Sequence, residues 1–451
     1  MNILKQKFAV ARDEPIVDSP LRTDMYKFHM MYFALKKGVQ NTPVRFGLFN
    51  RSKTFRFADV VPETALREQL DHIKQLKITA AKASFLQGLT AEVGGGREFI
   101  YPDPAFTNHL LGVRLCDYEL GVKQGEFALT FDGGWYAQDN CSGLWEIPAS
   151  STVSELGLYY TLKRMYDNND ITMSEIENFF NQMHTRLVEG AKIFMAAPSK
   201  PTMSPQGLRR AASVQHSIDS TLTLMDLLGP QCVGPSDVQL AMDIGSANPI
   251  GTVAHETSIV WPTLYEDTDD AMRESQFKFA LAWAETFPPP LRNLLPDTYG
   301  SRQFFDHAPA EIATLFPNYR PDSMTTEEAD VVYSQFLERH GVDKAGKGIF
   351  PSDGQTLVGF PAEHAQFSLE YARCSAGIGG DTTANFKGLI PGVEPANIVI
   401  KPISANGRPT VKIGDTPNGG KLTGVDPEHN KRAVHVFSEA GWAEHKTAIA
   451  A

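Results

Sequence analysis

The spacing of apolar positions along the chain becomes helical from about residue 150. Thr172 and Glu175 form a T-x-x-E capping box, a common start of a helix. Apolar residues then recur at helical spacing, at Ile176, Phe179, Phe180, Met183 and Leu187. A second apolar face ends at a Gly-Pro pair and comprises Val214, Ile218, Leu222 and Met225, followed by Gly229-Pro230. The pattern predicts two amphipathic helices before residue 230.

Beyond residue 230, short apolar runs alternate with helical stretches. The runs predict strands at 237–244, 250–254, 348–350 and 370–378, with helices at 268–286 and 325–340 between them. Alternation of this kind is typical of parallel βαβ units, and enough of these units can close into a barrel.

The pattern of predicted elements changes again near residue 400. Segments 397–404 and 408–415, separated by Ala405-Asn406-Gly407, predict a β-hairpin. The first 145 residues are mixed, with strands predicted at 44–49 and 127–135. We therefore expect an α/β barrel region that begins near residue 146 and ends near 399, and a separate layer formed by residues 1–145.

Composition narrows the class of partner. The chain has 451 residues and a formal net charge of −11, which argues against nucleic-acid binding because that function needs a large basic patch. An anionic small substrate remains compatible with this charge, since a few local donors can outweigh it. Four widely spaced cysteines form no CxxC pair and fit reduced thiols better than a zinc site or a disulfide framework.

The sequence shows no targeting or membrane segment. Residues 1–15 hold no apolar core of signal-peptide length, and no run approaches the roughly 18 apolar residues of a membrane span. We expect a cytoplasmic protein that binds neither membrane nor nucleic acid.

Four polar or glycine-rich turns carry the candidate chemistry, while the GxGxxG, GxxxxGK[ST], HExxH and GxSxG motifs are absent. Residues 250–256 present an imidazole, and residues 318–323 present a guanidinium, a carboxylate and a hydroxyl. Residues 351–354 and 376–383 are rich in small residues. Because backbone N–H groups must approach phosphate oxygens closely, such residues favour a phosphate site. Most of these turns follow predicted strands, where barrels collect catalytic groups.

The order of these segments resembles that of nicotinate phosphoribosyltransferases. The similarity begins at Thr23–Phe28 with Met30 and continues through 145–148, 154–156, 207–210, 251–256, 320–323, 352–354, 377–379, 397–401 and 406–409. It covers about residues 20–425, and its most specific pieces are the Gly-Thr-Val-Ala-His-Glu segment and the Asn-Gly-Arg-Pro hairpin.

The resemblance implies an α/β architecture with two domains. An irregular, incomplete (β/α) barrel would span 146–399, and a second α+β domain would be built from both chain ends, with 1–145 joined by 400–451. It also implies a homodimer with shared active sites, in which Tyr26 stacks on the pyridine ring held by the neighbouring subunit. Tyrosine suits that role because its ring stacks and its tip stays polar.

The resemblance further implies ATP-dependent transfer of a phosphoribosyl group from phosphoribosyl diphosphate to nicotinate in NAD salvage. His255 would be phosphorylated by ATP, its imidazole nitrogen being the nucleophile. Asp322 would hold the ribose hydroxyls beside the cationic centre, and Arg320 would pair with the nicotinate carboxylate. The other implied substrate-binding residues are Arg209, Ser236, Thr252 and Ser323, with Gly354, Gly379 and Gly380 at the phosphate.

Two further features bear on the substrates. Magnesium would bind mainly through the diphosphate, so no metal site made of protein ligands is expected. Ser236 stands where nicotinamide-using relatives carry an aspartate that reads the amide, which favours the acid as the base.

Three departures from the family pattern leave alternatives open. Gln206 replaces a ring-stacking phenylalanine, Met324-Thr325-Thr326 replaces Gly-Asp-Pro, and Asp381–Ala384 replaces a run similar to Asn-Leu-Thr-Asn. The alternatives are a paralogue that acts on another heteroaromatic acid and a binding or sensor protein without turnover. Fold by itself does not separate them.

Overall fold

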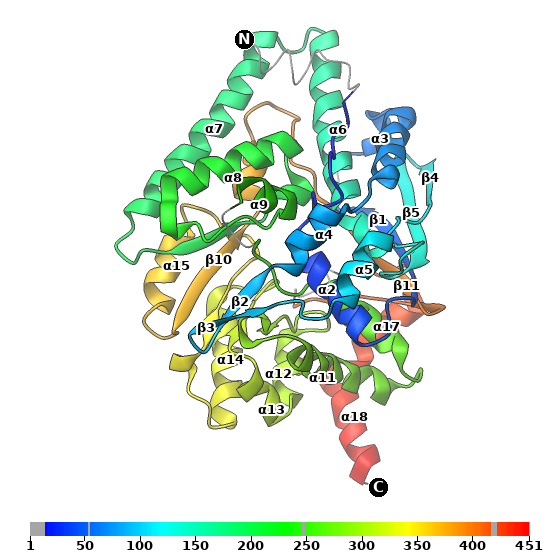
Figure 1. Cartoon of the computed structure of the whole chain (residues 1–451), viewed down its shortest axis with the longest axis vertical. Helices are drawn as coiled ribbons and strands as arrows, with labels where there is room; N and C mark the ends of the chain where they lie inside the picture. Colours follow the sequence, from blue (N-terminus) through cyan, green and yellow to red (C-terminus); the bar gives the residue numbers. More distant parts are fainter. Residues whose placement is uncertain (1–13, 53–54, 246–248, 416–421, 451) are drawn as a thin grey trace.

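The computed structural model describes residues 14–52, 55–245, 249–415 and 422–450 (Figure 1). Residues 1–13, on which the expectation about a signal peptide rests, lie outside the described residues. The described chain contains two five-stranded sheets and a small two-stranded one.

The first large sheet is antiparallel and draws strands from both ends of the chain. Its order is β12 (Arg408–Pro409), β11 (Ile398–Ala405), β1 (Pro43–Asn50), β5 (Glu126–Gly134) and β4 (Tyr118–Lys123). Side chains of β5 alternate between buried and more exposed, so one face of the sheet covers the core. The predicted hairpin after residue 397 is confirmed, although its second strand has only two residues.

The second large sheet is parallel throughout and stays open at its edges. Its order is β6 (Thr202–Pro205), β10 (Arg373–Ile378), β9 (Gly348–Ile349), β8 (Asn318–Tyr319) and β7 (Asn293–Leu294). No ladder joins β6 to β7 among the described residues. This is the expected incomplete barrel, beside an α+β part that contains strands from both chain ends; the residue boundaries between the two stay a prediction.

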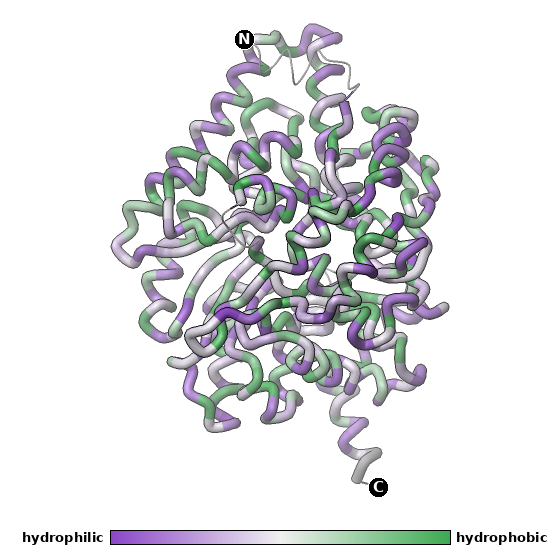
Figure 2. The backbone as a smooth tube through the Cα atoms, in the orientation of Figure 1, coloured by the Kyte–Doolittle hydropathy of each residue, from purple (hydrophilic) through white to green (hydrophobic). Residues whose placement is uncertain are grey.

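The two long amphipathic helices form where the sequence predicts them. Helix α7 (Met173–Ala196) starts with the Thr172–Glu175 capping box, in which both reciprocal hydrogen bonds are present. Its hydropathy alternates along the helix in Figure 2, and its buried side includes Phe179, Met183 and Leu187. Helix α8 (Val214–Leu228) ends at Gly229, whose φ of 54° suits glycine.

Most of the other predicted elements are also confirmed. Helices α11 (Asp269–Thr286) and α14 (Thr326–Arg339) and strands β1, β5, β9 and β10 match their predicted segments. The other α-helices of the described residues are α2 (Tyr26–Lys36), α3 (Glu63–Gln75), α4 (Ala80–Gln87), α5 (Ala105–Gly112), α6 (Glu146–Asp167), α9 (Val238–Ile244), α10 (His255–Val260), α12 (Ser301–His307), α13 (Ala310–Leu315), α15 (Phe360–Phe367), α16 (Gly380–Thr383), α17 (Pro427–Val436) and α18 (Glu439–Ala450). The small sheet pairs β2 (Thr90–Val93) with β3 (Gly96–Phe99).

Two predicted strands are wrong. Residues 237–244 form helix α9, because Asp237 caps its first turn by accepting hydrogen bonds from the N–H groups of Gln239 and Leu240, and Gly245 ends it in the left-handed region. Residues 250–254 belong to no sheet, and His255 starts helix α10 instead of ending a strand. At 237–244 the apolar run predicted a strand although Asp237 and Gly245 mark the two ends of a helix, whereas no side-chain cap marks the start of α10.

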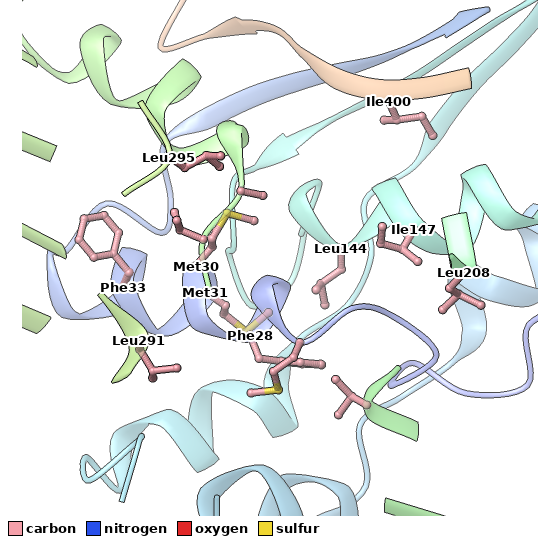
Figure 3. Close-up of a cluster of buried hydrophobic side chains, with 14 of the residues drawn as sticks. Phe28, Met30, Met31, Phe33, Leu144, Ile147, Leu208, Leu291, Leu295 and Ile400 are labelled. Atoms are coloured by element: carbon pink, nitrogen blue, oxygen red, sulfur yellow. The ribbon is translucent and has the colours of Figure 1, made fainter. Parts of the chain in front are cut away.

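Helix α2 lies near the centre of the molecule and is buried along most of its length (Figure 1). Figure 3 shows its side chains Phe28, Met30, Met31 and Phe33 within a buried apolar cluster that also contains Leu144, Ile147, Leu208, Leu291, Leu295 and Ile400. The cluster therefore joins the N-terminal layer, helix α6 and the parallel region in one core.

Two smaller expectations can be compared with the structure. All four cysteines are free and buried. A search of the described helices finds none whose length and apolar character would let it cross a membrane.

Candidate active site

The carboxyl ends of the five parallel strands deliver most of the candidate residues. Residues 206–210 follow β6, Asp297 follows β7, residues 320–323 follow β8, residues 352–354 follow β9, and Gly379 with Gly380 follows β10. Because parallel strands end at the same edge of a sheet, these segments meet there, which is where α/β proteins place their active sites.

His255 lies at this edge in contact with two residues that the sequence analysis did not identify. Its Nε2 atom is 2.6 Å from Asp297 Oδ1 and 3.0 Å from Lys412 Nζ. Lys412 in turn donates to Asp297 Oδ2 at 2.8 Å. All three side chains are buried, so their charges interact strongly.

The contacts assign the tautomer of His255. Burial lowers the pKa of the His255 imidazole to about 4, although Asp297 acts in the opposite direction, and the ring is neutral at pH 7. Burial alone would raise the pKa of the Asp297 carboxyl, but His255 and Lys412 hold it well below its usual range. The Asp297 carboxylate only accepts and the Lys412 ammonium only donates, so the two contacts to Nε2 favour opposite tautomers. The shorter contact, 2.6 Å to Asp297 against 3.0 Å to Lys412, favours the proton on Nε2 and the lone pair on Nδ1.

The same cluster has the spacing of a metal site but a different charge balance. Ligand atoms of His255, Asp297 and Asp322 lie within 4.8 Å of one another. The ammonium group of Lys412 already contacts two of these residues and compensates the Asp297 carboxylate. The arrangement therefore suits a histidine–aspartate pair better than a resident cation.

Asp322 and Arg320, predicted to act together, do lie together. Ser352 donates its hydroxyl to Asp322 Oδ1 at 2.7 Å, and Asp322 Oδ2 is 3.7 Å from His255 Nε2. Burial would raise the pKa of Asp322, but Arg320 and His255 lower it to about 2. Arg320 is anchored by Nε to Ser352 at 3.0 Å and by Nη1 to the Val253 carbonyl at 3.0 Å. Both Nη atoms keep N–H groups for a ligand.

Ser323 and Thr252 lie close to His255 but make structural bonds. Ser323 donates its hydroxyl within reach of Asp297, at 2.7 Å, and of Asp415, at 3.0 Å. Thr252 is half-buried and accepts from the Asn293 amide at 3.4 Å. Ser323 thus holds the carboxylate that holds His255.

The glycine-rich turns after β9 and β10 are tied to each other. Asp381 accepts from the Leu357 backbone N–H at 2.8 Å, and Gly377 N–H donates to the Pro351 carbonyl at 3.1 Å. Gly354 has φ +65°, and a Cβ added at Gly380 would meet nothing within 4 Å. These turns therefore present open backbone at the strand ends, as a phosphate site requires.

A second cluster gathers Tyr26 and Arg209 around the buried Glu146. Arg209 Nη1 lies 3.4 Å from Glu146 Oε1, and the Tyr26 hydroxyl lies 3.4 Å from Oε2. Lys27 and Lys401 bind the same carboxylate at 2.7 and 3.2 Å. Burial would raise the pKa of Glu146, but these cations hold it far below its usual range.

Lys27 extends this cluster to the residue next to His255. Its ammonium contacts both Glu146 and Glu256. Glu256 also accepts from Trp135 Nε1 at 2.6 Å and from the Tyr136 hydroxyl at 2.7 Å. Glu256 is therefore a buried structural anchor that accepts from three donors.

Ser236 binds Asp24, a residue for which the sequence predicted no role in the site. Its hydroxyl donates to Asp24 Oδ1 at 2.8 Å. Burial raises the pKa of the Asp24 carboxyl to about 6, although Ser236 and Arg209 act in the opposite direction. Ser236 and Asp24 thus form one polar unit beside Arg209.

Two further arginines extend the positive charge at this edge. Burial lowers the pKa of Arg210 to about 9, and Arg209 and Arg51 add to the lowering. Burial also lowers the pKa of Arg51, with Arg209 acting in the same direction and Asp353 opposing it. Three guanidinium groups therefore lie close enough to repel one another, which favours an anionic ligand between them.

The three departures from the family pattern have distinct places. Gln206 lies against Gly377, where an added Cβ would be 2.5 Å from its Oε1. Thr325 caps helix α14 and its capping box includes Glu328, so the changed run 324–326 serves the helix start. Thr383 donates to the Gly207 carbonyl at 2.9 Å and so supports the turn that carries Arg209.

Two reasons explain why the sequence did not predict Asp297, Lys412 and Arg51. Asp297 follows a strand of two residues, too short for its alternation to be recognised. Lys412 and Arg51 lie beyond β12 and β1, in the antiparallel part, and only the packing of that part against the parallel sheet brings them to the site. The one signal in the sequence that could have indicated these residues is that each lies in a polar segment following an apolar strand.

The raised pKa of Asp24 predicts a pH-dependent stability difference. The folded chain holds this proton more tightly than the unfolded chain between about pH 4 and 6, so Asp24 makes the wild type less stable as pH rises through that window. Asp24→Asn mimics the protonated acid and keeps an oxygen for Ser236. Urea unfolding at pH 4.5 and 7.5 should show the variant gaining about 1–3 kcal/mol over the wild type at the higher pH. A stability difference that does not change with pH contradicts the assignment.

The model of the nicotinate phosphoribosyltransferase (NAPRTase) family matches residues 203–440, and the model of that family's N-terminal domain matches residues 21–154.

Three solved structures share the fold at low sequence identity. Nicotinate phosphoribosyltransferase from Porphyromonas gingivalis is 23% identical and has a TM-score of 0.74, covering 93% of this chain and 99% of that one. The enzyme from Vibrio cholerae is 20% identical with a TM-score of 0.76, covering 98% and 99%. A putative nicotinate phosphoribosyltransferase from Saccharomyces cerevisiae is 24% identical with a TM-score of 0.75, covering 94% and 99%. Because the family model matches more than half of the residues of this chain, the chain belongs to the nicotinate phosphoribosyltransferase family.

Proposed function

We propose that the chain is an ATP-dependent nicotinate phosphoribosyltransferase of NAD salvage. It would convert nicotinate and phosphoribosyl diphosphate into nicotinate mononucleotide and diphosphate. The observation that carries the proposal is the meeting of His255, Asp322 and Arg320 at one edge of the parallel sheet in a member of this family.

The transfer step exchanges one bond at ribose C1 for another. The pyridine nitrogen forms a bond to C1, and the C1–O bond to the diphosphate breaks, its electron pair leaving with the diphosphate. Positive charge develops at C1 during this exchange. Asp322, ionised and held by Ser352, is suited to bind the ribose hydroxyls and to stabilise that charge.

The base would lie between Tyr26 and the arginines. The remaining Nη donors of Arg320 match the nicotinate carboxylate in a planar contact, and Arg209, which also interacts with Asp322, adds positive charge. The Ser236–Asp24 pair borders the same space. This charge pattern favours an acid over an uncharged amide as the base.

The diphosphate would bind among Arg51, Arg209 and Arg210, whose mutual repulsion an anion relieves. Asp322 and Asp353 lie near these arginines and are the hard oxygen ligands that magnesium prefers, so the site fits a cation carried by the diphosphate. When bound, magnesium would neutralise charge on the leaving group. The arginines hold that group in place and exclude other orientations.

His255 would be the phosphorylation site. Its Nε2–H is held by Asp297, which leaves the Nδ1 lone pair to attack the γ-phosphorus of ATP; the bond from that phosphorus to the bridging oxygen breaks and ADP leaves. Lys412, buried beside the ring, is placed to balance the negative charge that the phosphoryl group brings. Hydrolysis of phosphohistidine would then accompany release of products.

A second candidate is transfer to another heteroaromatic acid. The half-buried Gln206, in place of the stacking phenylalanine, has a side-chain amide for which the described residues provide no hydrogen-bond partner. Such an amide is suited to a base with an additional polar group. Turnover measured with nicotinate, nicotinamide and quinolinate, each with and without ATP, separates the candidates; nicotinate with ATP should be the best substrate.

Removing the imidazole tests the phosphorylation site. His255→Ala should take up no labelled phosphate from ATP and should lose ATP hydrolysis, while slow transfer without ATP remains. Radiolabel in the intact protein measures the first effect and product formation measures the second. Continued labelling of the variant would show that another residue is phosphorylated.

Gly380→Ala tests the phosphate site. The added methyl group meets no protein atom within 4 Å, so stability should not change, whereas a 5′-phosphate bound to the local N–H groups would be crowded. KM for phosphoribosyl diphosphate should rise about tenfold, the effect of losing roughly one good hydrogen bond. Gly346→Ala is the matched control. Its added methyl group also meets no protein atom within 4 Å, but Gly346 precedes β9 and so lies at the amino end of the parallel strands, whereas Gly380 lies at their carboxyl end. Equal KM values in both variants would place the phosphate elsewhere.

A homodimer with shared sites is part of the proposal and has a separate test. Tyr26 and Asp322 would then come from different subunits at each site, although within one chain both couple electrostatically to Arg209. Tyr26→Ala and Asp322→Asn chains, each inactive, should regain about a quarter of wild-type activity when mixed under conditions of subunit exchange. Mixtures that stay inactive would show that each chain builds its own site.

A further inference from the structure

One buried titratable group beside the proposed site has no part in the reaction described above. His29, on helix α2, is almost completely buried and sits next to Tyr101 and Gly251. Burial lowers its pKa to about 3, so the ring is neutral. A histidine kept neutral at such depth serves either as packing or as an oriented pair of hydrogen-bonding atoms.

The partners of His29 define that orientation. Nε2 lies 3.1 Å from the Gly251 carbonyl oxygen, and Nδ1 lies 2.9 Å from the Tyr101 hydroxyl. A carbonyl only accepts, so Nε2 carries the proton and donates to Gly251, while Nδ1 accepts from Tyr101. Both ring nitrogens are thereby satisfied, and the chain Tyr101–His29–Gly251 has a single direction.

Gly251 opens the segment that leads to His255. A Cβ at this position would lie 2.9 Å from the Tyr26 backbone nitrogen, so the segment packs directly on the first turn of α2. The rest of the segment belongs to no sheet: Val253 and Ala254 pack in the core, Asn293 binds Thr252, and Arg320 binds the Val253 carbonyl. Its position depends on such contacts because no ladder fixes it.

We infer that His29 is a positioning residue that holds residues 251–254 against α2 and thereby sets the place of His255 for phosphoryl transfer. The inference rests on the proposed function of His255. It assigns to Tyr101 the task of orienting His29.

Three variants separate the hydrogen bond from the packing. His29→Leu keeps volume and removes both polar atoms; His29→Gln keeps a nitrogen donor at a similar reach; Tyr101→Phe removes one hydroxyl. His364→Leu is the matched control, because His364 is also buried with a pKa lowered by burial, but lies on α15. The measurements are the initial rate of His255 labelling by ATP, KM for nicotinate, and hydrogen exchange of residues 250–256.

His29→Leu should slow labelling about tenfold and speed exchange of the segment, while KM for nicotinate stays within about twofold, since the loss is one buried hydrogen bond. His29→Gln should recover labelling to within about threefold of wild type. Tyr101→Phe, the mildest change, should fall between them and remains informative if His29→Leu fails to fold. The control should match wild type in both labelling and exchange.

Two results overturn the inference. One is labelling and exchange in His29→Leu equal to those of the control; the other is an equal fall in labelling for Gln and Leu, which would indicate a packing role. A wild-type chain that takes up no phosphate refutes the proposed ATP coupling instead. In that case the exchange of residues 250–256 decides by itself whether His29 holds the segment.

Discussion

Lys27 is buried between two carboxylates, and the rest of the site depends on that arrangement. It joins Glu146, the first residue of helix α6, to Glu256, the second residue of helix α10. Glu146 also binds Lys401 and Arg209, but no other ammonium or guanidinium is described next to Glu256. Removing Lys27 would therefore leave a buried carboxylate unpaired, at a cost of about 3–5 kcal/mol. The ion pairs therefore help to fix α2, α6 and α10 relative to one another, and these helices, together with Glu146, position Tyr26, Arg209 and His255.

Electrostatics at the site opposes the charge of the whole molecule. The chain carries a net charge of −11, yet Arg51, Arg209 and Arg210 gather at one edge of the parallel sheet. Two acidic groups at this edge have different roles. Asp297 is paired with Lys412, whereas Asp322 is bound by Ser352 and is proposed to bind the ribose hydroxyls. A local positive field within an acidic protein attracts phosphorylated substrates without promoting binding to nucleic acid.

The departures from the family pattern separate into structural and chemical ones once the fold is known. The run at 324–326 begins helix α14, and Thr383 supports the turn that carries Arg209, so both serve the scaffold. Gln206 differs, because its amide stands at the end of β6 among the candidate ligand groups. Gln206 is therefore the one of these departures that is expected to affect which base is bound.

Periodicity in the sequence determined the long elements: the Thr172 capping box, the face of α8 and the 405–407 hairpin could all be read locally because their signals are local. The resemblance in motif order predicted His255, Arg320 and Asp322 as site residues, and the fold brings these three side chains close together. Only the tertiary structure decided that Asp297 and Lys412 flank His255. Those contacts join residues 42 and 157 positions apart, and no local pattern records which distant side chain will neutralise a buried charge.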